Sequence, residues 1–175
     1  MKKITSKADL MAMYDAAKGR LALRLAGAKT DSKKKDILIC GDTGCLVSNS
    51  QDIIANLRAE VKAAGLENDV NVVQTGCFGF CAQGPIVKIM PDNVFYVKVT
   101  PEDAKEIVQK HIVEHKLVDR LVYVEPTLKA QITDCQQMPF YKKQQRIALR
   151  NCGVIAEENI DEYIAAEGFQ GLAKA

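Results

Sequence analysis

The chain has 175 residues, of which 47% are hydrophobic and 26% are charged. This balance is typical of a folded globular protein and argues against extensive disorder. The 24 basic and 22 acidic residues give a formal net charge of +2, so we expect no strong attraction to nucleic acid or to an anionic membrane.

The N-terminus gives no sign of export. Residues Met1 to Ser6 include lysines but no apolar stretch followed by a cleavage site, as a secretory signal would have. No stretch is long and apolar enough to span a bilayer. We therefore expect a cytoplasmic protein, in which thiols stay reduced. Six cysteines in such a chain favour metal binding or redox chemistry over a disulfide framework.

The chain is predicted to open with an amphipathic helix. Ser6 and Asp9 resemble a capping box, and apolar residues recur at helical spacing from Leu10 to Leu25. Gly27 is the expected end of this helix.

A strand, a helix and a second strand are predicted next. The apolar, partly β-branched run Ile37 to Cys40 indicates a buried strand. Apolar residues on one face predict a helix from about Gln51 to Ala64, and Gly65 is the expected stop. Val70 to Gln74 then reads as a second strand.

The following segment predicts a hairpin and a helix. Residues 86–90 and 94–99 flank a turn-forming triplet, and Thr100-Pro101-Glu102-Asp103 is a good start for a helix that runs to about His115. The order strand, helix, strand, then strand, strand, helix predicts an α/β protein with a thioredoxin-like sheet. The opening helix is extra, and the C-terminal extension is helical.

The C-terminal part has a weaker pattern. An apolar run at residues 121–124 predicts a strand, and residues 127–137 read as linker. A helix is predicted from Pro139 to about Arg150, and Asn159 with Glu162 caps another. We therefore divide the chain into a sheet domain at 1–115, a strand and linker at 116–138 and a helical segment at 139–175.

Four cysteines lie in two glycine-rich loops, and each loop follows a predicted parallel strand. The spacings are Cys40-x4-Cys45 and Cys77-x3-Cys81. Because the carboxyl ends of parallel strands meet at one edge of a sheet, we expect the four thiols to come together. A 2Fe-2S cluster needs four thiolates, two at each iron, which two pairs on two loops supply.

Three alternatives remain for these cysteines. A structural zinc site also takes four thiolates, although its pairs are usually spaced more tightly. A catalytic dithiol would have Cys-x-x-Cys at the first strand-to-helix turn, and the sequence contains no such pair. Buried inert cysteines are the third reading.

Other reactive residues receive ordinary interpretations. Cys135 and Cys152 lie outside the sheet domain and have no partner at ligand spacing. His111, Glu114 and His115 match a short zinc-peptidase pattern, but no third ligand is evident, so a helix end is the preferred reading. We find no nucleophile triad or phosphate-binding loop, and predict that this chain contains no catalytic centre.

Several segments together resemble a known family. The two cysteine loops, at 40–45 and 75–85, and the tail segments at 144–153 and 160–165 are similar to one subunit of multimeric bacterial hydrogenases. They resemble the thioredoxin-like 2Fe-2S ferredoxin domain at the start of its flavin-bearing, NADH-binding subunit. That subunit is itself similar to the NADH-binding flavoprotein subunit of respiratory complex I.

The resemblance implies a role in electron transfer. It implies that Cys40, Cys45, Cys77 and Cys81 bind a 2Fe-2S cluster within an NAD(H)-linked multisubunit oxidoreductase such as a bifurcating hydrogenase. The implied partners are other subunits of that complex and ferredoxin. FMN, NAD and a 4Fe-4S cluster would belong to a remainder of the subunit beyond Ala175. A zinc-stapled thioredoxin-fold scaffold and a free-standing 2Fe-2S ferredoxin stay open as alternatives.

Overall fold

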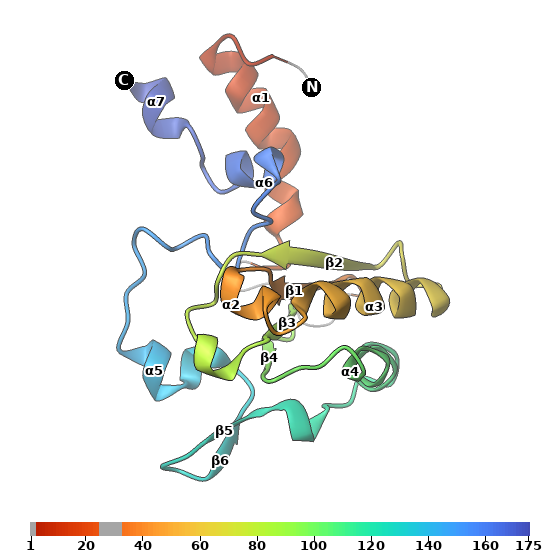
Figure 1. The fold of residues 1–175 in the computed structure, drawn as a ribbon. Coiled ribbons are helices and arrows are strands. Elements are labelled where there is room, and N and C mark those ends of the chain that lie inside the picture. The colour runs from red at the N-terminus through yellow and green to blue at the C-terminus, as the bar shows by residue number, and fades with distance from the viewer. Residues whose placement is uncertain (1–2, 25–32) are drawn as a thin grey trace.

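The computed structural model describes residues 3–24 and 33–175 (Figure 1). Its centre is a four-stranded sheet in the order β2-β1-β3-β4. Strand β1 (Lys35–Cys40) pairs in parallel with β2 (Val70–Thr75) and antiparallel with β3 (Val87–Met90), which pairs antiparallel with β4 (Val94–Tyr96). The predicted α/β sheet is confirmed.

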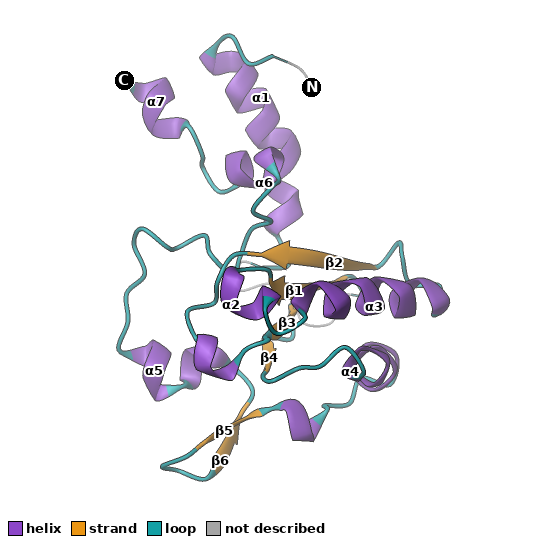
Figure 2. Cartoon of the chain, viewed as in Figure 1, coloured by secondary structure: helices purple, strands orange, loops and turns teal. Residues whose placement is uncertain are grey.

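One face of the sheet is covered by two helical segments. Helix α3 (Ser50–Ala63) connects β1 to β2, and α4 (Asp103–Glu106) continues as a π-helical stretch at Ile107–Val113. Both bury apolar side chains against the strands. Figure 2 shows these helices and the strands by secondary structure. This core includes Ile37, Ile39, Ile53, Leu57, Ile89, Tyr96, Ile107 and Val108.

The end of α3 is the one that the sequence predicted. Gly65 has φ of +70°, and its N–H and that of Leu66 donate to the carbonyls of Lys62 and Val61. These bonds satisfy carbonyls at the helix end, and glycine adopts the left-handed conformation without a Cβ penalty.

The start of α4 differs from the prediction. The helix begins at Asp103 instead of Pro101. The N–H and hydroxyl of Thr100 donate to the Asp103 carboxylate over 2.7 and 3.1 Å. The carboxylate thus reaches back to satisfy a donor at the helix entry, as the second half of a capping box does.

The two ends of the chain lie together on one side of the molecule (Figure 1). Helix α1 (Lys7–Ala17), followed by a 3-10 turn at Lys18–Leu21, packs against α6 (Ile160–Ala165). Ser6 and Asn159 cap these helices as predicted. Helix α7 (Gln170–Lys174) ends the chain. The predicted end of the first helix, at Gly27, lies outside the described residues.

The C-terminal part covers the second face of the sheet. Leu38 and Phe95 of the sheet are buried there with Tyr123, Met138 and Tyr141. Strands β5 (Tyr123–Glu125) and β6 (Ala130–Ile132) form a separate hairpin, with 3-10 turns at Asp119–Leu121 and Cys135–Gln137. The predicted linker therefore contains a second strand.

Helix α5 is much shorter than predicted. It spans only Pro139–Lys142, and no helix or strand occurs between it and α6. Ile147 and Leu149 are 71% and 59% exposed, so a helix here would have no apolar face to bury. An isolated helix without such packing is unstable in water. Among the described residues, we find no helix that is long and apolar enough to cross a bilayer.

Candidate functional site

The four predicted ligand cysteines lie at one end of the sheet. Cys40 is the last residue of β1, and Cys45 lies in the single turn of α2 (Thr43–Leu46). Cys77 follows β2, and Cys81 opens a 3-10 turn at Cys81–Gln83. Cys40 is in register with Thr75 of the parallel neighbour. Both loops therefore leave the sheet at the same end, where the two strands finish.

The second pair faces the solvent. The sulfur atoms of Cys77 and Cys81 are 3.4 Å apart, and Cys81 is exposed while Cys77 is half-buried. The Gly79 N–H donates to Cys77 Sγ over 3.2 Å, with φ of +85° at Gly79. A residue with a side chain would be strained in that conformation, so the glycine allows the amide to point at the sulfur.

The first pair is buried. Loss of hydration raises the pKa of Cys40 to about 12, although a hydrogen bond from the Asp42 backbone acts in the opposite direction. Burial also raises the pKa of Cys45, against hydrogen bonds from Cys40 and from the Ile86 backbone. Without a cation both thiols stay protonated at neutral pH, so they become thiolates only with metal bound.

The two pairs form one electrostatic site. The charge of Cys77 raises the pKa of both Cys40 and Cys45. The pKa of Cys81 is raised first by its hydrogen bond with Cys77 and also, more weakly, by the charge of Cys40. Four anionic sulfurs would repel one another, and bound iron supplies the positive charge that offsets the repulsion.

Gly84 keeps space open between the pairs. A Cβ on this residue would lie 2.9 Å from Cys45 Sγ and 3.3 Å from the Cys81 carbonyl oxygen. Backbone amides also point at three of the four sulfurs, those of Cys40, Cys45 and Cys77. Such donors stabilise the negative charge of a thiolate-bound cluster, so the donor set fits a 2Fe-2S group.

The described side chains contain no preformed site for a single metal ion. Across residues 3–24 and 33–175, no group of three or more His, Cys, Asp or Glu that could hold a metal ion is found. A 2Fe-2S cluster requires two protein thiolates at each iron.

The C-terminal segment packs onto the second cysteine loop. The Tyr141 hydroxyl donates to the Phe78 carbonyl over 3.0 Å, and Phe140 stacks on Phe80 with ring centroids 4.9 Å apart. The Arg146 guanidinium donates to the Cys77 carbonyl over 3.1 Å and to the Cys152 carbonyl over 3.2 Å. Sequence reasoning missed these contacts, because no local pattern pairs residues so far apart in the chain.

The remaining cysteines lie nearby but apart from the two pairs. Cys135 is buried in the second core, and this burial raises its pKa. Cys152 is half-buried beside the second loop, where a Cβ on Gly76 would be 3.6 Å from its sulfur.

The histidines of the peptidase-like pattern have other surroundings. His111 is buried, with Nδ1 2.6 Å from the Tyr96 hydroxyl and Nε2 3.0 Å from the Asp92 carboxylate. His115 is exposed and has φ of +55° just beyond the helix. These contacts favour the reading of the pattern as a helix end.

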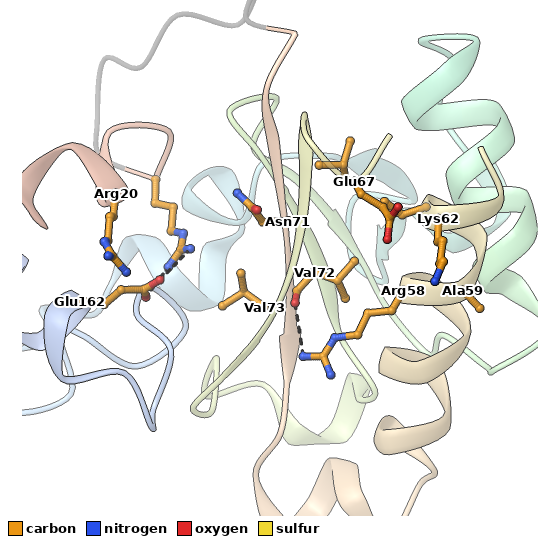
Figure 3. Close-up of a pocket in the computed structure, with 12 residues that line it drawn as sticks. Arg20, Arg58, Ala59, Lys62, Glu67, Asn71, Val72, Val73 and Glu162 are labelled. Atoms are coloured by element: carbon orange, nitrogen blue, oxygen red, sulfur yellow. Dashed lines mark hydrogen bonds and ion pairs between the residues drawn. The ribbon is translucent and has the colours of Figure 1, made fainter. Parts of the chain in front are cut away.

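A larger cavity lies away from the cysteines. It has a volume of about 720 Å³ and runs along the outer edge of β2, where Arg20, Arg58, Lys62 and Glu162 line it (Figure 3). Arg58 donates to the Val72 carbonyl over 3.5 Å. None of the four predicted ligands lines this cavity, so it is separate from the candidate site.

Sequence comparisons show which known proteins the chain is similar to. Residues 28–111 match the family model described as thioredoxin-like 2Fe-2S ferredoxin. A 2Fe-2S ferredoxin of Clostridium pasteurianum is 43% identical over 77 residues, which are 44% of this chain and 76% of that protein. The NADP-reducing hydrogenase subunit HndC of Solidesulfovibrio fructosivorans is 67% identical over 33 residues, 19% of this chain and 7% of that subunit.

A similar solved structure is the crystal structure of the wild-type thioredoxin-like 2Fe-2S ferredoxin from Aquifex aeolicus. It is 30% identical, and the match covers 53% of this chain and 98% of that one, with a TM-score of 0.48.

Proposed function

Because the chain belongs to the thioredoxin-like 2Fe-2S ferredoxin family, we propose that it relays single electrons through a cluster held by Cys40, Cys45, Cys77 and Cys81. One observation carries the ligand assignment. Two cysteine pairs meet at the ends of two parallel strands, inside the matched range, with Gly84 leaving room between them.

The residues around the site divide it into a sheltered half and an open half. Cys40 and Cys45 are buried, and their sulfur atoms accept hydrogen bonds from the backbone amides of Asp42 and Ile86. The bound cluster supplies one-electron chemistry, with no bond made to a substrate. Cys77 and Cys81 lie toward solvent, so their loop is the side at which a redox partner comes closest.

Anaerobic purification tests the ligand assignment. We expect two irons and two sulfides per chain and a rhombic EPR signal after reduction. Cys81→Ser should lower the iron content or change the EPR signal, because it replaces a predicted ligand. Cys152→Ser, the matched control, should leave both unchanged. A colourless wild-type protein with one zinc would contradict the proposal and support the zinc-stapled scaffold.

The chain is further proposed to belong to an NAD(H)-linked multisubunit oxidoreductase in the cytoplasm. The support is the short match to HndC, whose name describes it as a subunit of an NADP-reducing hydrogenase. In this proposal residues 1–115 form the cluster domain, 116–138 connect it, and 139–175 lead toward a flavin module. Partner subunits or the remainder of this subunit then bind FMN, NAD and a 4Fe-4S cluster.

Purification of the tagged protein from its own cells tests this wider assignment. We expect co-purification of bound flavin, and reduction of the 2Fe-2S EPR signal by NADH or NADPH. A protein that carries the cluster but neither associates with flavin nor responds to a nicotinamide would be a free-standing ferredoxin instead.

A further inference from the structure

We propose that residues 135–156 form a cationic docking surface, beside the second cysteine loop, for an acidic electron-carrier protein. This inference rests on the proposed cluster function. The segment contains four basic residues, Lys142, Lys143, Arg146 and Arg150, and no acidic one. The acids next to it in the sequence are Asp134 and Glu157, and the chain as a whole has nearly balanced charge, so the excess of positive charge is confined to this stretch.

The segment lies where electrons would leave or enter. Tyr141 and Arg146 hydrogen-bond the carbonyls of Phe78 and Cys77, so they fix the segment to the loop that carries the solvent-facing cysteines. Lys142, Lys143 and Arg150 are exposed. A partner attracted by these cations would therefore be placed next to Cys77 and Cys81.

A cavity of about 250 Å³ gives the surface a specific feature. Lys88, Arg146 and Arg150 line it together with Phe78 of the cysteine loop, and no aspartate or glutamate does. Carboxylates form strong, often bidentate, hydrogen bonds with guanidinium groups. The cavity is therefore suited to an acidic side chain of the partner.

Exposed apolar side chains complete the surface. Ile147 and Leu149 lie among the cations and are 71% and 59% exposed, and Phe140 is 43% exposed next to Phe80. Protein interfaces combine an apolar, aromatic centre with a charged rim. Asp42 of the first loop is an acid near the ligands, since its charge raises the pKa of Cys81.

The electron count of the encounter is simple. A reduced carrier passes one electron to the oxidised cluster, so the carrier is oxidised by one electron and the cluster is reduced by one. No covalent bond forms or breaks. Electrostatic attraction raises the rate of encounter and depends strongly on ionic strength.

Charge reversal tests the proposal in the cluster-loaded protein. The variant K142E/K143E/R150E reverses three exposed cations of the segment. The control K7E/K62E/K105E changes the net charge equally on α1, α3 and α4, away from the cysteine loops. Iron content and EPR signal are measured for each, to establish that the cluster is intact.

Two reactions are followed by stopped flow at low and high salt. One is oxidation of the reduced protein by hexacyanoferrate(III), and the other is electron donation by a reduced acidic plant-type ferredoxin. At low salt we expect the segment variant to react about tenfold more slowly than the wild type in both reactions. The rates of the control variant should differ from the wild-type rates by less than about twofold. High salt should remove the difference.

Several results would overturn the proposal. Equal rates for the two variants would show that net charge, not this surface, governs the encounter. An effect on hexacyanoferrate(III) but not on the acidic ferredoxin would indicate a local field without docking. Analytical ultracentrifugation could instead show that the wild-type protein is a dimer and the segment variant a monomer. The surface would then be an interface between copies of the chain. A wild-type protein without iron would refute the proposed function itself.

Discussion

Gly84 matters to the candidate site because it has no side chain. It stands between the buried and the exposed cysteine pairs, close enough to each that even a methyl group would intrude. Two contacts converge there, one with the sulfur of Cys45 and one with the backbone of Cys81. At the residue scale, the site therefore depends on a missing side chain as well as on four thiols.

We predict that Gly84→Ala impairs cluster binding. Its Cβ would lie 2.9 Å from Cys45 Sγ, so the loops must move apart by several tenths of an ångström. Overpacking of this kind costs about 1–3 kcal/mol. Iron content after anaerobic reconstitution should fall, and loss of the visible absorption in the presence of a chelator should be faster.

Gly44→Ala is the control, because a Cβ at Gly44 in the first cysteine loop meets nothing within 4 Å. It should retain the wild-type iron content. Equal retention of iron by both variants would rule out the steric role of Gly84.

At the element scale, one carboxylate joins three separate parts of the sheet domain. Asp92 lies in the turn between β3 and β4. It accepts a hydrogen bond from Lys35 at the start of β1 over 2.7 Å, and lies 3.0 Å from His111 of the π-helical stretch. Burial alone would raise the pKa of Asp92, but the hydrogen bonds and charges of these two partners hold it below its ordinary value of 3.8.

This lowered pKa predicts how stability changes in acid. The unfolded chain takes up the proton at a higher pH than the folded chain does, so the contribution is complete above about pH 5 and is lost as the pH falls through the folded pKa. We expect Asp92→Asn to cost about 2 kcal/mol at pH 7 and progressively less in acid. Urea unfolding at several pH values measures this difference.

Asp15→Asn is a suitable reference, because Asp15 pairs with exposed Lys18. It should change stability by less than about 0.5 kcal/mol at any pH. A constant cost of Asp92→Asn between pH 7 and pH 3 would contradict the assigned role.

The elements were predictable where local chemistry decides them. The strand at Ile37–Cys40 and the stop at Gly65 follow from apolar runs and glycine conformation, and both are present. Strand β6 was missed because Ala130 and Gln131 are exposed and give no alternating pattern. The early end of α5 was missed because it depends on burial, which a local pattern does not reveal.

The candidate site was predictable to a similar extent. Cysteine spacing and strand order place the four thiols at one edge, since register follows from parallel pairing. The covering contacts of Tyr141 and Arg146 depend on how the tail folds back across the sheet. Such long-range packing leaves no periodic signal in the sequence.

At the scale of the whole molecule, a buried ion cluster ties both chain ends to the sheet. Arg24, near the N-terminal helix, pairs with Asp36 of β1 over 2.6 Å and with Glu162 of α6 over 2.7 Å. All three side chains are almost fully buried. Glu162 also accepts a hydrogen bond from the Ala156 N–H over 2.6 Å.

We predict that Glu162→Gln strongly destabilises the protein. The variant loses the carboxylate that accepts two hydrogen bonds from Arg24, while Arg24 stays paired with Asp36, so we expect a cost of about 1.5–3 kcal/mol. Denaturant unfolding should show this loss, and amide hydrogen exchange should rise in α1 and α6.

Asp161→Asn provides the comparison on the same helix. Asp161 pairs with Arg20 over 3.3 Å at a partly exposed position, so the loss should stay below about 1 kcal/mol. Similar losses for the two variants would show that the buried cluster has no special role.

The tail that covers the second sheet face sets the size of the unit that could be moved between proteins. The family match ends at residue 111, yet Tyr123, Met138 and Tyr141 complete the core around Leu38 and Phe95. A gene fusion cut at that boundary would carry the cysteines but leave an apolar sheet face open to water, prone to self-association. The transplantable module therefore extends at least through residue 141.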